Sequence, residues 1–274
     1  MLFPAAPRAK LLTASLALLL TSLSFVNPTA AKPIATRTCR SENNTATAPA
    51  GPGPTHYGIL LPQALAPLDV FGPLEVFQAL ARSTHLQLSV LARSLDPVSS
   101  GPTNDTMNRF NSTFWPSFVP THTYADDPDI QVLLIPGGGV ARSPDLGPEI
   151  EYVRKVFPRL EYLITICTGS GIAAQAGVLD GYRATTNKRA WAETVKKGPN
   201  VKWVSPARWV DDGKVWSSSG VTAGIDLAFA FLEAKYPNGT AMAEFFSSVM
   251  EHERILDWRH DPYAEKLKIP PTNN

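Results

Sequence analysis

Short runs of consecutive apolar residues constrain the fold of this chain more than any other feature of its sequence. The run "VLLI" at residues 132–135 would leave no polar side chain on either face of an extended strand. Such a strand must be covered on both faces, as it is in a parallel sheet between two layers of helices. Comparable strands are expected within residues 56–62, 86–93, 130–139 and 160–166.

Segments with helical spacing alternate with these strands. Leu74, Phe77 and Leu80 predict a helix over residues 72–82. Further helices are expected at 148–157, immediately after Cys167, at 222–236 and at 240–258, and two strands are expected around an Asp212-Gly213 turn. The alternation predicts an α/β fold, a doubly wound parallel sheet sandwiched by helices.

The first 31 residues have the pattern of a secretory signal peptide. Arg8 and Lys10 precede an apolar run from Leu11 to Val26, and small residues follow it. The run is shorter than the roughly 20 residues of a spanning helix, which disfavours the alternative of a signal anchor. We therefore expect a secreted, extracellular protein. Residues 32–54, rich in Pro, Gly, Ser and Thr, would be a flexible tail, 55–262 the folded domain and 263–274 a C-terminal tail.

The charge balance excludes two classes of partner. Removal of residues 1–31 takes two of the 25 basic residues and none of the 24 acidic ones, which leaves a net charge of −1. This balance gives no reason to expect nucleic acid or an anionic membrane as a partner after signal cleavage.

The chain has two cysteines, Cys39 and Cys167, and therefore no disulfide framework. Cys39 falls in the polar tail, so we expect Cys167 to be a free thiol. Four sequons, at Asn43, Asn104, Asn111 and Asn238, predict a glycoprotein if the source is eukaryotic.

Residues 96–129 interrupt the alternation of strands and helices as a long loop insertion. The segment is rich in Pro, Asn, Ser and Thr but also contains Phe110, Phe114, Trp115 and Phe118. Loops of this length are functional or disordered in compact domains. Both a glycosylated surface excursion and a lid over the site are compatible with it.

Cys167 stands where the strand at 160–166 ends and a helix begins without a linker. This junction lies at the carboxyl edge of the sheet, where open α/β folds bind ligands. The N–H groups of the helix would favour the thiolate and lower the pKa of the thiol. Cys167 is therefore a candidate nucleophile on an elbow, and an inert buried cysteine is the alternative.

Two neighbouring motifs would complete such a site. Gly138 and Gly139, in "PGGG", end the preceding strand and could offer backbone N–H groups to a developing negative charge. Asp69 follows the first strand, just before a helix expected near Pro73, and is either a general acid and base or a helix cap.

Four segments in this order resemble the DJ-1/PfpI superfamily: "LDVFGPLEVF", "LLIPGGG", "ICTGSGIAAQAGVLDGYRATTN" and "SSSGVTAGIDLAFAFLE". Within it they are most similar to the isonitrile hydratases. The resemblance spans about residues 56–236 and implies a flavodoxin-like sandwich, a homodimer and a nucleophilic cysteine at the elbow. It also implies catalytic roles for Cys167 and Asp69, with Thr168 orienting the site.

The sequence departs from the family pattern near the site. Many members have His directly after the cysteine, where Thr168 stands, and the isonitrile hydratase pattern has a His-Trp pair where Asn187 and Lys188 stand. Ser218 and Ser219 replace glycines before Gly220.

Three functions follow as hypotheses. The first is a cysteine-dependent hydro-lyase that hydrates a small isonitrile to an N-substituted formamide, without a metal or organic cofactor. The second is a non-catalytic small-molecule binding protein, and the third is a redox or carbonyl-stress protein that uses Cys167.

Overall fold

The computed structural model describes residues 51–272. The expected signal peptide, nearly all of the expected N-terminal tail, and Cys39 lie outside the described residues. None of the helices within residues 51–272 is long and apolar enough to cross a bilayer.

A seven-stranded sheet forms the centre of the described domain, with the strand order β10-β11-β7-β6-β1-β2-β5. All neighbouring pairs are parallel except β10 and β11. In chain order the strands are β1 (His56–Leu60), β2 (Gln87–Ala92), β5 (His122–Thr123), β6 (Val132–Ile135), β7 (Tyr162–Thr165), β10 (Trp209–Asp212) and β11 (Val215–Ser218).

Consecutive residues of the central strands enter two different hydrophobic cores. In β6, Val132 and Leu134 pack in one core, whereas Leu133 and Ile135 pack in the other. Successive side chains of a strand point to opposite faces, so an uninterrupted apolar run serves both cores. This arrangement confirms the predicted parallel sheet covered on both faces.

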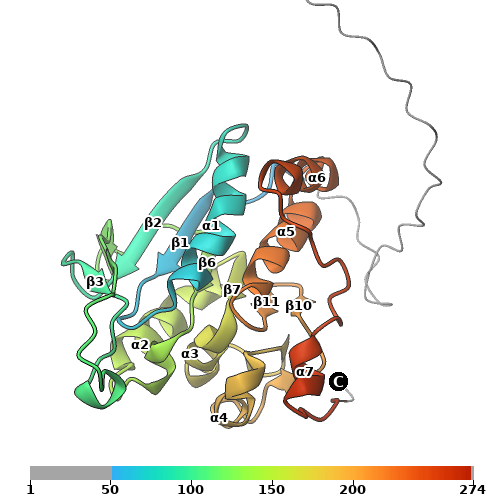
Figure 1. Ribbon diagram of the computed structural model, residues 1–274. Coiled ribbons are helices and arrows are strands. Elements are labelled where there is room, and N and C mark those ends of the chain that lie inside the picture. Colours follow the sequence, from blue (N-terminus) through green and yellow to red (C-terminus); the bar gives the residue numbers. More distant parts are fainter. Residues whose placement is uncertain (1–50, 273–274) are drawn as a thin grey trace, which may run out of the picture. The chain divides into compact units, whose positions relative to one another are not determined.

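The helices divide between the two faces (Figure 1). The core that contains Val132 includes residues of α1, α5 and α6, and the core that contains Leu133 includes residues of α2, α3 and α4. The α-helices are α1 (Pro67–Ala81), α2 (Gly147–Val156), α3 (Ser170–Gln175), α4 (Trp191–Val195), α5 (Ala223–Lys235), α6 (Gly239–Val249) and α7 (Pro262–Lys266). Short 3-10 turns occur at η1 (Asp105–Met107), η2 (Gly139–Arg142), η3 (Phe157–Arg159), η4 (Cys167–Gly169) and η5 (Lys188–Ala190).

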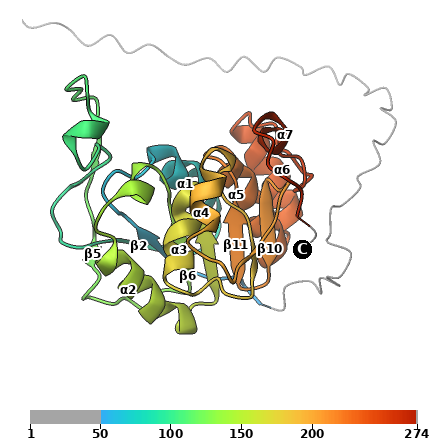
Figure 2. The same ribbon diagram turned by 90° about the horizontal axis from the view of Figure 1, so that it is seen from below.

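Two two-stranded sheets form in addition to the central one. β8 (Arg183–Ala184) pairs with β9 (Lys202–Trp203). β3 (Val98–Ser99) pairs with β4 (Ser117–Phe118) and closes the base of the insertion at 96–129. Between β3 and β4 the chain runs outward through η1, which is the green projection in Figure 2.

Several predicted boundaries were wrong. α1 begins at Pro67, six residues before Pro73, because proline is favourable in the first turn and Pro73 is accommodated inside the helix. The turn between β10 and β11 is Gly213-Lys214, since Asp212 pairs with Val215. α6 ends at Val249 rather than near Trp258.

The segment expected as a C-terminal tail is packed on the domain instead. It contains part of α7, and the Thr272 N–H donates a hydrogen bond of 2.8 Å to the Ser205 carbonyl. Asp261 caps α7 by accepting from the Tyr263 N–H at 3.0 Å. A capping Asp followed by Pro at the first helical position is a helix-start signal that the sequence does contain.

Candidate active site

Cys167 lies on a sharp elbow between β7 and α3. Its φ is +56°, a left-handed backbone conformation that costs a non-glycine residue about 1–2 kcal/mol. The turn packs against the end of β6 so closely that a Cβ at Gly169 would lie 2.2 Å from the Ile135 carbonyl oxygen. Glycine is therefore required at residue 169 for the strand-to-helix turn to close.

The thiol of Cys167 is free and nearly buried, with 4% of the residue exposed. Asn187 donates a hydrogen bond from Nδ2 to the sulfur at 3.2 Å. Burial, together with the charge of Asp69, raises the pKa of the thiol to about 12, against the lowering effect of donors on Thr168 and Asn187. The expected lowering of the thiol pKa by a helix N-terminus was therefore wrong, because desolvation of the thiolate outweighs the donors.

Asp69 lies in the first turn of α1 and is fully buried. Its Oδ2 accepts a hydrogen bond of 2.8 Å from the Gly137 N–H, whereas Oδ1 makes no hydrogen bond of normal geometry within the described residues. Burial raises the pKa of this carboxyl to about 6, although the bond from Gly137 and an interaction with the Cys167 thiol oppose the rise. The structure thus brings Asp69 and Cys167 close enough to shift each other's pKa.

The glycine loop is held against the elbow by Thr168. The Gly138 N–H donates to the Thr168 hydroxyl at 3.0 Å, so this N–H is already paired rather than free for an anion. Gly138 has φ +119°, and a Cβ there would lie 2.4 Å from the Ala66 nitrogen. Gly139 begins η2 and lines a cavity. The backbone N–H of Thr168 interacts with the Cys167 sulfur and favours the thiolate.

Three residues at the site were not among the candidates from the sequence: Gly137, Asn187 and Lys188. Asn187 and Lys188 follow β8, and the neighbouring Thr186 hydroxyl donates to the Cys167 carbonyl at 3.0 Å. The sequence signal for Asn187 and Lys188 was that they stand where the isonitrile hydratase pattern has a His-Trp pair. Gly137 lies in the "PGGG" motif, and a Cβ at this residue would lie 2.5 Å from the Thr168 nitrogen, so the motif was the signal that could have identified it.

Lys188, the residue after Asn187, is buried and carries a positive charge. Its ammonium lies 3.0 Å from Asp261 Oδ2 and donates to the Thr185 hydroxyl and the Ala207 carbonyl, at 2.8 and 2.9 Å. Burial lowers the pKa of Lys188, and Asp261 opposes this shift. The pair links the loop that carries Asn187 to the cap of α7.

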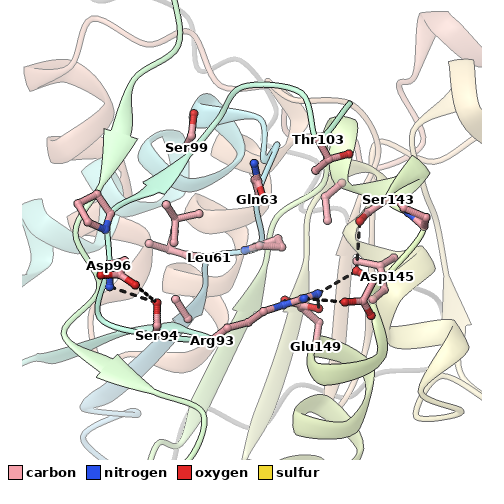
Figure 3. Close-up of a pocket in the computed structure, with 17 residues that line it drawn as sticks. Leu61, Gln63, Arg93, Ser94, Asp96, Ser99, Thr103, Ser143, Asp145 and Glu149 are labelled. Atoms are coloured by element: carbon pink, nitrogen blue, oxygen red, sulfur yellow. Dashed lines mark hydrogen bonds and ion pairs between the residues drawn. The ribbon is translucent and has the colours of Figure 1, made fainter. Parts of the chain in front are cut away.

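Two cavities border the loops of the site, and Cys167 lines neither. One, of about 520 Å³, is bounded by Ala64 to Pro67, by Gly138 and Gly139, and by residues of the insertion. The other, of about 430 Å³, is lined by both apolar and charged side chains, among them Leu61, Arg93 and Glu149 (Figure 3). Among residues 51–272, no three His, Cys, Asp or Glu side chains gather in a way that could hold a metal ion.

The DJ-1/PfpI family model matches residues 59–234. The chain belongs to this family. It is 31% identical over 182 residues to isonitrile hydratase of Pseudomonas putida, a match that covers 64% of this chain and 70% of that protein. Further sequence similarity is to an uncharacterized protein in the cpoL 5' region of Streptomyces lividans, 26% identical over 151 residues, which covers 54% of this chain and 98% of that protein.

Solved structures of this family have the same fold. A ThiJ/PfpI family protein from Pseudomonas syringae superposes with a TM-score of 0.58 at 24% identity, covering 81% of this chain and 85% of that one. DJ-1beta of Drosophila melanogaster superposes with a TM-score of 0.57 at 15% identity, covering 73% and 99%. The predicted flavodoxin-like sandwich is confirmed.

Proposed function

We propose that this DJ-1/PfpI protein is a cysteine-dependent hydro-lyase that converts a small isonitrile, R–NC, to an N-substituted formamide, R–NH–CHO. The observation that carries the proposal is the buried pair of Cys167 and Asp69, in which each group shifts the pKa of the other. Similarity to isonitrile hydratase at 31% identity supports the choice of substrate.

The resting pair near neutral pH is a neutral thiol beside a carboxylate. The pKa values of about 12 for Cys167 and about 6 for Asp69 place the proton on sulfur. Part of the thiol shift comes from the charge of Asp69, so transfer of the proton to Asp69 removes one cause of the high pKa. The donors on Asn187 and Thr168 then stabilise the thiolate.

The first half of the reaction forms the bond between sulfur and carbon. Asp69 takes the thiol proton as the Cys167 sulfur adds to the terminal carbon of the isonitrile. The electron pair of the third carbon–nitrogen bond returns to nitrogen, the carbon keeps its own lone pair as a carbanion, and protonated Asp69 delivers the proton to that carbon. The product is a thioimidate, R–N=CH–S–Cys167, with Asp69 again ionised.

In the second half of the reaction, water adds to the thioimidate and the bond between sulfur and carbon breaks. Asp69 removes a proton from water as the oxygen adds to the thioimidate carbon, and then passes that proton to the nitrogen. The tetrahedral adduct R–NH–CH(OH)–S–Cys167 then collapses, its hydroxyl proton passes through Asp69 to the leaving sulfur, and the formamide is released. The sum is R–NC plus H₂O giving R–NH–CHO, with both side chains restored.

Turnover of cyclohexyl isocyanide to N-cyclohexylformamide tests this proposal. The wild-type chain, with Cys167 titrated as reduced, should form the product, and Cys167→Ala and Asp69→Asn should each lower kcat at least about 100-fold, the usual contribution of a nucleophile or acid and base. Cys39→Ala is the matched control and should keep full activity. No product from reduced wild-type protein would overturn the proposal.

A non-catalytic binding protein is the second candidate, favoured by the burial and high pKa of the thiol. In that case a ligand would raise the melting temperature of wild type and Cys167→Ala equally, with no product formed. The same burial disfavours a redox role, because oxidation follows thiolate character and exposure.

We also propose that the chain is secreted after removal of residues 1–31 and that the mature protein is a homodimer. The charge pattern of the N-terminal segment supports secretion. N-terminal sequencing of protein from the culture medium and light scattering of the purified chain would test the two statements separately.

A further inference from the structure

The cavity of about 520 Å³ lies between the glycine loop of the site and the insertion at 96–129. Ala66, Gly138 and Gly139 form one side, and Met107, Phe114 and Trp115 of the insertion form the other. Its volume falls within the range of small-molecule sites. The insertion therefore builds a wall beside the loop that contacts Thr168 and Asp69.

Backbone hydrogen bonds fix this wall to the site. The Ala64 N–H donates to the Ser99 carbonyl of β3 at 3.0 Å, and the Val140 N–H donates to the Ala64 carbonyl at 3.1 Å. Leu65 and Gly138 form a β-bridge in the same region. The base of the insertion, the loop after β1 and the glycine loop are thus joined as one unit.

The lining of this cavity is apolar. None of the residues around it carries a charge, and Ser100 is the one with a polar side chain. The Trp115 indole N–H is already donated to the Ser112 carbonyl at 2.8 Å. Trp115 is 42% exposed and Phe114 is 93% exposed. An apolar ligand would bury these surfaces, which is favourable in proportion to the area removed from water.

The second cavity differs because charged side chains lie beside the apolar ones in its lining (Figure 3). Arg93 donates to both oxygens of Glu149, at 2.7 and 2.6 Å, and to Asp145 Oδ2 at 2.8 Å. Its guanidinium is therefore neutralised by two carboxylates, and these three charged groups form part of the cavity lining. An apolar group entering there would desolvate charges, so the two cavities differ in what they can accept.

We propose that the apolar cavity binds the hydrocarbon substituent of the substrate, with Met107 and Trp115 as specificity-determining residues. The identity of the reacting group rests on the proposed isonitrile hydration. The lining of the cavity alone indicates that the bound substituent is apolar. The substrate class is then an isonitrile with a bulky aliphatic or aromatic group rather than a small or charged one.

Substituent size and direct binding together test the proposal. For cyclohexyl isocyanide, Trp115→Ala, which removes apolar contact area, and Met107→Lys, which places a charge in the apolar lining, should each raise KM about tenfold. Both should change KM for methyl isocyanide less than about twofold. Calorimetric titration of N-cyclohexylformamide into Cys167→Ala should show the same dependence on Trp115. Phe110→Ala is the matched control, since Phe110 is an aromatic of the same insertion, is 92% exposed and does not line the cavity.

The outcomes separate the subsite from the reaction. Equal KM and equal formamide affinity in wild type and Trp115→Ala would overturn the subsite while leaving hydration intact. Binding of the formamide that depends on Trp115, without turnover of any isonitrile, would support the cavity and overturn the proposed reaction. A rise in KM for Phe110→Ala as large as that for Trp115→Ala would also count against the subsite.

Discussion

The side-chain amide of Asn187 donates to the sulfur of Cys167 at 3.2 Å while its oxygen accepts from the N–H groups of Arg189 and Ala190. One side chain therefore caps η5 and solvates the nucleophile at the same time. The orientation is fixed by the two backbone donors, so the NH₂ group must face the sulfur.

Replacement of this amide by a carboxylate should make the thiol less acidic. Asn187→Asp keeps an oxygen for the cap but places a negative charge beside the sulfur in place of a donor. We expect alkylation of Cys167 by iodoacetamide at pH 9 to slow about tenfold, since a hydrogen bond to a charged group contributes about 1.5–3 kcal/mol. Asn200→Asp, at an exposed residue, is the control, and an unchanged rate in Asn187→Asp would contradict the assigned contact.

Removal of the Asp69 charge should have the reverse effect on the thiol and still abolish turnover. The charge is one cause of the raised pKa of Cys167. In Asp69→Asn the alkylation profile should therefore move to lower pH, while isonitrile hydration is lost. The full pH profile of alkylation measures this shift, with Asp180→Asn as an exposed control. A profile that stays in place would mean that the two groups are not coupled.

Asp69 should also make folding stability depend on pH. Its pKa rises from 3.8 to about 6 in the folded state. The folded state therefore binds the proton more tightly, and the stability that this proton contributes is present below pH 4 and lost as the pH rises through 6. The loss is about 3 kcal/mol, from about 1.4 kcal/mol per pKa unit.

Urea unfolding of wild type and Asp69→Asn between pH 4 and pH 7.5 measures this contribution. The Asn variant should gain about 3 kcal/mol relative to wild type over that interval, because Cys167 stays protonated in both proteins at these pH values and the remaining groups cancel in the difference. A difference independent of pH would show that the Asp69 carboxyl has an ordinary pKa.

Removal of one partner of the Lys188–Asp261 ion pair should lower the free energy of unfolding more than removal of both charges. Lys188→Met leaves a buried carboxylate without its partner, which costs about 3–5 kcal/mol in the free energy of unfolding. Lys188→Met/Asp261→Asn leaves no charge and should recover part of that loss. Lys155→Met is the matched control, because Lys155 is 54% exposed where it pairs with Asp127. A loss in Lys188→Met as small as in the control would contradict this account.

The sheet was predictable because its signal is local to each strand. Four apolar runs identified β1, β2, β6 and β7, and the junction at Cys167 followed from a strand and a helix without a linker. The start of α1 was misjudged because Pro73 reads as a helix start, although Pro67 provides one earlier.

The protonation of the site was not predictable in the same way. A helix N-terminus is visible in the sequence, but the burial that reverses its effect on Cys167 comes from residues of distant elements. The contact between Lys188 and Asp261 joins residues more than seventy positions apart, and neither has a local pattern that points to the other.

Asp261 connects the segment around α7 to the loop beside the nucleophile through its ion pair with Lys188. Because Asp261 neutralises Lys188 and also starts α7, a protein truncated before residue 261 would leave an unbalanced ammonium group behind the loop that presents Asn187 to Cys167. Proteolytic trimming at this end would therefore act as an inactivating event far from the thiol in sequence.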